Sequence, residues 1–166
     1  MKYVRSLFSV ILILGAIAGM AVPVAYASTE NNSMFGTIVS EQIVQLADNQ
    51  EAVITVYSSS ASTYATSYMR AGTKKYAIRN SSGDIMFELI LQGAFQVNQG
   101  VSAVCISASH DYEIYDSNWR YINGLSHANA NKAYANATFK EVIDSIPVFT
   151  QEVSVVLTCD ENGNLS

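Results

Sequence analysis

IMFELILQGAFQV, residues 85–97, is the stretch that decides the fold. Its odd-numbered positions are all apolar or glycine, whereas its even-numbered positions include Glu88, Gln92 and Gln96. Apolar side chains at every second position are typical of a β-strand with one buried face. We therefore predict a long strand over 85–97 that places its odd-numbered side chains in the core.

Turn-forming sequences lie on both sides of this strand, NSSGD at 80–84 and NQG at 98–100. Such sequences favour hairpins, so the strand is expected to form a meander with its neighbours in the chain. Alternation and turn signals predict strands at 37–46, 52–58, 63–70, 74–80, 85–97, 101–109, 110–115, 119–123, 132–140 and 152–159.

Two of the later strands have a clear inner face. In 132–140 three alanines and a phenylalanine alternate with Tyr134, Asn136, Thr138 and Lys140, and the small inner residues leave room for Trp119 or Phe95 opposite. In 152–159 the predicted inner positions are Val153, Val155, Leu157 and Cys159.

Many short strands, regular turns and almost no helix predict an all-β fold, either an antiparallel β-sandwich or a flattened barrel. We expect the sandwich, as one domain over 37–166. The spacing of Cys105, Trp119 and Cys159 resembles the Cys, Trp, Cys spacing of immunoglobulin domains, so we expect an immunoglobulin-like general architecture. Leu157 stands where those domains have a corner tyrosine, so we do not expect their detailed strand order.

The first 27 residues read as a cleaved signal peptide. Lys2 and Arg5 precede an apolar run over 7–22, and Ala25 and Ala27 place small side chains before the predicted cut. A secreted, extracellular protein is therefore expected. It would begin at residue 28, with 28–36 as a flexible leader.

The charge balance argues against two classes of partner. The chain carries nine Lys and Arg against 14 Asp and Glu, a net charge of −5. Loss of Lys2 and Arg5 with the signal leaves seven positive against fourteen negative charges, or −7. Such a surface is not expected to bind nucleic acid, nor an anionic membrane after signal cleavage.

Both cysteines belong to the part predicted to be exported, where thiols oxidise if their geometry allows. We expect a disulfide between Cys105 and Cys159. His110 and His127 have no metal-ligand spacing with either cysteine, so no metal or cofactor is expected. The closing CDENGNLS (159–166) then reads as a disulfide cysteine, a turn and a solvated end. A weak calcium contact at Asp160 is the alternative.

Two groups of residues are candidates for a functional site. Tyr112, Tyr115, Trp119 and Tyr121 form the densest aromatic cluster, which either stacks on sugar rings or fills the core. Asp111, Glu113 and Asp116 could supply the carboxylate pair of a glycoside hydrolase, although such pairs are common on solvated sheet faces.

The chain from Tyr76 to its end resembles short secreted β-rich proteins of Gram-positive, often gut-dwelling, bacteria. The motifs that carry the resemblance are NSSGDIMFELILQGAF, VSAVCISAS, YEIYDSNW and LTCDENGNLS. The resemblance implies export and a β-rich fold, and it implies no reaction.

The sequence favours a secreted, non-enzymatic binding or interaction module. Its expected partner is a cell-wall or dietary glycan, or an extracellular protein. A small glycan hydrolase that uses acidic residues is one alternative. A toxin-like or bacteriocin-like exported protein is another, although membrane-attacking peptides are usually cationic.

Overall fold

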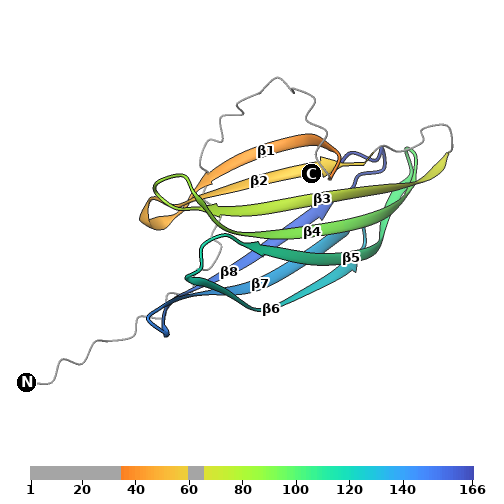
Figure 1. Cartoon of the computed structure of the whole chain (residues 1–166). Helices are drawn as coiled ribbons and strands as arrows, with labels where there is room; N and C mark the ends of the chain where they lie inside the picture. The colour runs from red at the N-terminus through yellow and green to blue at the C-terminus, as the bar shows by residue number, and fades with distance from the viewer. Residues whose placement is uncertain (1–34, 60–65) are drawn as a thin grey trace, which may run out of the picture.

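The computed structural model describes residues 35–59 and 66–166 (Figure 1). Within these ranges the regular elements are antiparallel β-strands and one short 3-10 helix, which confirms the all-β prediction. The same ranges contain no helix that is long and apolar enough to span a membrane. The predicted signal peptide, with Ala25 and Ala27, lies outside them. The elements are β1 (Thr37–Gln45), η1 (Ala47–Asn49), β2 (Glu51–Ser58), β3 (Ser67–Arg79), β4 (Ile85–Asn98), β5 (Ser102–Ile114), β6 (Trp119–Asn129), β7 (Lys132–Ile143) and β8 (Ile146–Thr158).

The strands form two sheets that pack face to face. One sheet has five strands in the order β1-β2-β3-β4-β5, and the other has three in the order β6-β7-β8. Consecutive strands therefore pair with each other except at β5 and β6, which belong to different sheets, and the predicted meander around β4 is confirmed. Figure 1 shows β7 and β8 running behind β3 and β4, with β5 and β6 side by side where the chain passes from one sheet to the other.

Several predicted boundaries are wrong. The strands expected at 63–70 and 74–80 are one continuous strand, β3, in the described part of that region. Gly72 does not interrupt it, and the lack of a side chain there leaves room for Leu165: a Cβ atom would lie 2.5 Å from Leu165 Cδ1. The strands expected at 101–109 and 110–115 likewise form the single strand β5.

The three-stranded sheet is longer than predicted. β6 continues to Asn129 rather than ending at 123, and β8 begins at Ile146 rather than at 152. β8 contains Pro147, which has no N–H to donate. It is tolerated because β8 is an edge strand and its pairing with β7 is irregular at this point, between Glu141 and Val142.

Aromatic rings hold the two sheets together. Phe87 of β4 stacks on Phe139 of β7, with ring centroids 4.1 Å apart and planes 20° apart. Trp119 of β6 packs against the same Phe87 at 4.6 Å. All three side chains are almost fully buried, so Trp119 fills the core, which is one of the two alternatives that the sequence left open for it.

Small residues let the sheets approach closely beside these rings. The alanines 133, 135 and 137 are buried on the inner face of β7, as predicted. Ala133 lies opposite Gly93 of β4, where an added Cβ would be 3.0 Å from the alanine methyl group. The predicted inner residues of β8 are buried as well: Val153, Val155, Leu157 and Cys159.

The disulfide prediction is wrong. Cys105 and Cys159 are both buried free thiols, and they do not lie near each other. The Cys105 thiol donates to Ser107 O at 3.3 Å and the Cys159 thiol to Asp160 O at 3.6 Å. Both strand ends are instead tied to the turn between β6 and β7, because Cys105 N donates to Ala130 O and Cys159 N to Asn131 O.

The environment of each thiol keeps it protonated. Burial raises the pKa of the Cys105 thiol, against a smaller opposite effect of its hydrogen bond to Ser107. Burial, helped by the nearby Asp160 carboxylate, raises the pKa of the Cys159 thiol to about 11. Thiolate is the reactive form, so both cysteines are expected to be inert in the folded protein at neutral pH.

The closing segment CDENGNLS forms a tight turn that returns Leu165 to the core. Asp160 Oδ1 accepts hydrogen bonds from the backbone N–H groups of Asn162 and Asn164, at 2.9 and 2.8 Å. Asp160 Oδ2 accepts from the Asn164 side chain at 2.8 Å. The hydrogen bonds from Asn164, Asn162 and Gly163 outweigh the opposite effect of burial and lower the pKa of Asp160. Both oxygens thus serve the turn rather than a cation.

We expect two free thiols per chain. Alkylation of the native protein should be slow, and after unfolding in guanidinium without reductant two thiols should react with Ellman's reagent. The check is a thiol titration before and after unfolding. Thiols that appear only after a reductant is added would contradict the structure.

Removal of an aromatic ring from the Phe87–Phe139 stack should destabilise the fold. Phe139→Ala should lower the free energy of unfolding by about 3–5 kcal/mol, because it removes a fully buried ring and leaves a cavity between the sheets. Urea denaturation followed by circular dichroism measures this. Val148→Ala, at an exposed position of β8, is the control and should change stability by less than about 0.5 kcal/mol. Equal losses in the two variants would contradict the role of the stack.

Candidate functional site

The predicted aromatic cluster does not form one exposed platform. Trp119 is 1% exposed and packs between Phe87 and Phe149, the latter edge-on at 6.2 Å. Its indole ring is therefore part of the core and presents no face to a ligand.

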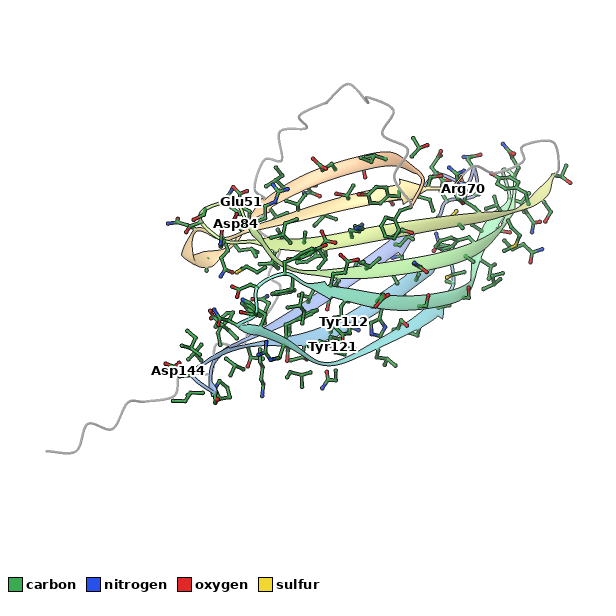
Figure 2. The ribbon with its side chains drawn as sticks, in the orientation of Figure 1. Glu51, Arg70, Asp84, Tyr112, Tyr121 and Asp144 are labelled. Atoms are coloured by element: carbon green, nitrogen blue, oxygen red, sulfur yellow. The ribbon has the colours of Figure 1, made fainter. Side chains whose placement is uncertain are left out.

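Tyr112 and Tyr121 are brought together, but they stack on each other. Their ring centroids are 4.0 Å apart and their planes differ by 6°. Tyr112 comes from β5 and Tyr121 from β6, which are the facing edges of the two different sheets (Figure 2). Phe139 lies edge-on beneath both rings, at 6.4 and 5.7 Å. No backbone pairing joins β5 to β6, and the two stacked rings fill the space between these strands instead.

A histidine and a glycine complete this β5–β6 seam, which we define as His110, Tyr112, Tyr121 and Gly124. His110 Nε2 lies 3.1 Å from the Tyr121 hydroxyl oxygen. A Cβ at position 124 would lie 2.6 Å from that oxygen and 2.7 Å from His110 Nε2, so only glycine fits. Burial, with a smaller contribution from Tyr112, raises the pKa of Tyr121. These contacts hold β5 of one sheet against β6 of the other.

Tyr115 lies apart from the seam, near the carboxylates of Glu113 and Glu88. Glu88 is not among the candidates predicted from the sequence. The Tyr115 hydroxyl donates to the Glu113 carboxylate, and this bond, more than burial and the charge of Glu88, raises the pKa of Tyr115. Glu88 is 6% exposed and faces Glu113 across the strand pair. Lys75 neutralises Glu88 through an ion pair of 3.2 Å. Glu88 is the only charged residue of β4, and this is the signal for it in the sequence.

The other candidate carboxylates serve the backbone. Asp111 Oδ1 accepts from the N–H of Tyr112 at 2.8 Å, and Asp116 Oδ1 accepts from the N–H of Asn118 at 2.9 Å in the loop before β6. The described residues contain no group of three or more His, Cys, Asp or Glu side chains arranged to hold a metal ion. The two hollows described next are not lined by Asp111, Glu113 or Asp116.

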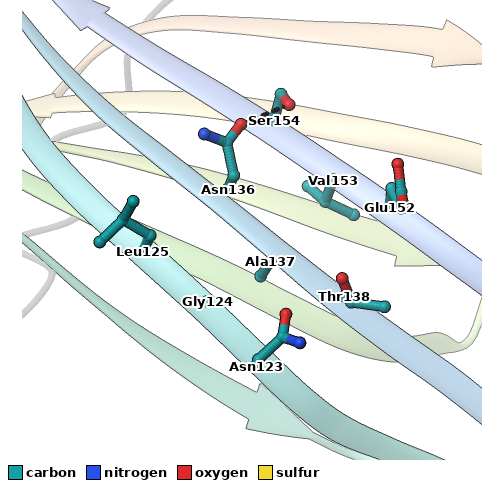
Figure 3. Close-up of a pocket in the computed structure, with 9 residues that line it drawn as sticks. All are labelled: Asn123, Gly124, Leu125, Asn136, Ala137, Thr138, Glu152, Val153 and Ser154. Atoms are coloured by element: carbon teal, nitrogen blue, oxygen red, sulfur yellow. Dashed lines mark hydrogen bonds between the residues drawn. The ribbon is translucent and has the colours of Figure 1, made fainter.

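The larger hollow lies on the outer face of the three-stranded sheet (Figure 3) and has a volume of about 440 Å³. A second hollow, of about 220 Å³, lies over small residues of β3, β4 and β5 on the other sheet. The side chains drawn in Figure 3 stand on β6, β7 and β8 around the larger hollow. Its lining residues are Asn123, Gly124, Leu125, Asn136, Ala137, Thr138, Glu152, Val153 and Ser154.

Strand register arranges the outward side chains of this hollow in two rows that cross the sheet. Residues directly opposite each other on antiparallel strands have Cβ atoms about 5 Å apart. The rows are Asn123–Thr138–Glu152, which we call the acidic row, and Leu125–Asn136–Ser154, which we call the amide row.

The polar groups of the acidic row have no partners within the described residues. No hydrogen bond or ion pair there engages the side chains of Asn123, Thr138 or Glu152. In the amide row Ser154 Oγ donates to Asn136 Oδ1 at 2.6 Å, which leaves the Asn136 amide NH₂ group free to donate. Among the described residues, the remaining side-chain donors and acceptors of the hollow thus have no protein partner and are available to solvent or a ligand.

A stacked pair of rings borders the hollow. His127 and Tyr134 are opposite each other on β6 and β7, one row beyond the amide row. Their ring centroids are 4.8 Å apart and the planes differ by 4°. They extend the outer face of the sheet as a rigid polar and aromatic edge.

Sequence analysis identified only part of this site. It placed Tyr134, Asn136 and Thr138 on the outer face of their strand, as observed. It ended the preceding strand at 123, and so it missed Leu125 and His127 as strand residues. The segment NGLSHAN (123–129) has few residues with high β-propensity, so its pairing depends on β7 rather than on its own composition.

Comparison of the chain with protein-family models, with curated proteins and with solved structures finds no match.

The β5–β6 seam should not tolerate a methyl group at position 124. Gly124→Ala should lower the free energy of unfolding by about 1–3 kcal/mol, because the new Cβ would displace Tyr121 and His110. Urea unfolding checks this. Leu125→Ala, at the next and exposed position of β6, is the control and should cost less than about 0.5 kcal/mol. A Gly124→Ala protein as stable as the control would show that the seam is loose.

Proposed function

We propose that the chain is an extracellular, non-enzymatic binding module that recognises a glycan on the outer face of β6, β7 and β8. The single observation that carries the proposal is the hollow of unpartnered amide, hydroxyl and carboxylate groups across these three strands. Extracellular location stays a prediction from the signal-like residues 1–27. We also propose that the fold is a β-sandwich, immunoglobulin-like in its two-sheet architecture and a simple meander in its strand order.

Hydroxyl-rich ligands match this chemistry. Each sugar hydroxyl both donates and accepts, and the two rows offer amide N–H donors beside amide, hydroxyl and carboxylate acceptors. The strands hold these groups on a rigid sheet, so that little conformational entropy is lost when a ligand binds. The hollow extends across three neighbouring strands of one sheet face, which suits an extended chain of sugars better than a small enclosed ligand.

The geometry supports the hydrolase alternative less well. Asp111 and Asp116 accept backbone hydrogen bonds, and Glu88 is neutralised by Lys75. A glycoside hydrolase needs two carboxyl groups that flank a sugar bond, one of them ready to donate a proton. The larger hollow has one carboxylate, Glu152, among its lining residues.

A protein partner is the second candidate, and one observation favours it. Exposed apolar side chains gather at the turn that joins β7 to β8, which projects past the larger sheet in Figure 1. Apolar patches of this kind often mark protein–protein contacts. The exposed residues are Ile143, Ile146, Val148 and Phe149.

Glycan binding should depend on the amide row. On an array of neutral oligosaccharides the purified protein should bind at least one probe saturably, and Asn136→Ala should weaken that binding about tenfold or more, since it removes both a free donor and the partner of Ser154. Gln96→Ala, at an exposed position of β4 on the other sheet, is the control and should bind as the wild type does. Circular dichroism should show that both variants are folded. Absence of saturable binding, or equal losses in both variants, would overturn the proposal.

A further inference from the structure

We infer that the hollow prefers glycans that carry free, protonated amines over neutral glycans, and disfavours glycans that carry carboxylates. This inference rests on the proposed glycan-binding function of the same surface. It specifies the class of sugar that the hollow selects.

The first argument is the charge inside the hollow. Glu152 is the only ionisable side chain among the lining residues. It is exposed, and no ion pair or hydrogen bond to its carboxylate forms within the described residues. An ammonium group bound here would meet an unpaired carboxylate, whereas a sugar carboxylate would meet a like charge.

The second argument is the chemistry next to Glu152. An ammonium group has three N–H donors and no acceptor. The acidic row places the Thr138 hydroxyl directly beside Glu152 and the Asn123 amide one strand further on, so oxygen acceptors continue across the sheet. The adjacent amide row is left to hold the hydroxyls of the same or the next sugar.

The third argument is the position of the nearby cations. Arg120 is occupied, since its guanidinium donates to the backbone oxygens of Ser117 and Trp119. Lys140 lies one row beyond the acidic row, opposite Thr150, and makes no ion pair with Glu152. Neither cation therefore neutralises the carboxylate in the hollow.

The charge of the whole chain acts in the same direction. A net charge of −5 creates a field that attracts cationic polymers and repels anionic ones. The preference should be small, because solvent screens an exposed charge pair and the pair then adds little to the free energy of binding. We expect amine-bearing oligosaccharides to bind about two- to fivefold more tightly than neutral ones of the same length at low salt.

The test uses three β-1,4-linked hexasaccharides of equal length. These are glucosamine hexamer, which is cationic at pH 6, N-acetylglucosamine hexamer, which is neutral, and glucuronic acid hexamer, which is anionic. Calorimetry with the full-length wild-type chain should give affinities in that order. The ratio of amine to neutral affinity should fall towards one at high salt, because salt screens exposed charges.

The variant that isolates the effect is Glu152→Gln, which keeps the shape and removes the charge. In this variant the ratio of amine to neutral affinity should approach one. Glu161→Gln, the same change at an exposed residue of the closing turn, is the matched control and should keep the wild-type ratio.

The outcomes separate the two proposals. A neutral probe that binds with no amine preference, or a preference that survives in Glu152→Gln, overturns this inference and leaves the glycan-binding proposal standing. Failure of all three probes to bind overturns the inference, and the array of neutral oligosaccharides then decides the proposed function by itself.

Discussion

The stack of Phe87 on Phe139 is the contact on which the rest of the structure depends. It joins β4, next to the edge strand β5 of the five-stranded sheet, to β7, the middle strand of the three-stranded sheet. Trp119, Tyr112 and Tyr121 all pack against one ring or the other. Because each sheet is a meander of neighbouring strands, hydrogen bonding within a sheet does not position one sheet on the other. Side-chain packing does so, and the rings set both the distance and the orientation.

Small residues explain why the proposed binding surface lies on an outer face and not between the sheets. Gly93 and Ala133 approach so closely that a Cβ on the glycine would crowd the alanine, and the returning Leu165 fills the space beside Gly72. The β5–β6 seam closes the remaining side. With the interior filled in this way, polar side chains without partners lie on the outer faces, and one hollow lined by such groups spans β6, β7 and β8.

The fold was more predictable than the site, for physical reasons. In β4, β7 and β8 the alternate apolar side chains are buried, so each strand and its inner face can be predicted from that segment of sequence alone. The disulfide prediction failed because two cysteines can both face the core and still lie far apart. The distance between them depends on how the two sheets stack, which the alternation does not show. The hollow was missed because it combines three strands by register, and β6 contributes Asn, Gly, Ser and His residues that do not look like a strand. Glu88 and Leu125 became informative only once their neighbours across the sheet were known.

The simple strand order also bears on how the protein folds. Each hairpin joins residues that are close in the chain, so the loop-closure entropy of every pairing is small and such pairings can form early. Docking one meander on the other brings together residues as distant as Gly72 and Leu165 and must exclude water from the aromatic stack. The inter-sheet contacts therefore carry the larger cost in loop-closure entropy. The same contacts bury the alanine-lined inner face of the three-stranded sheet, whose other face carries the hollow.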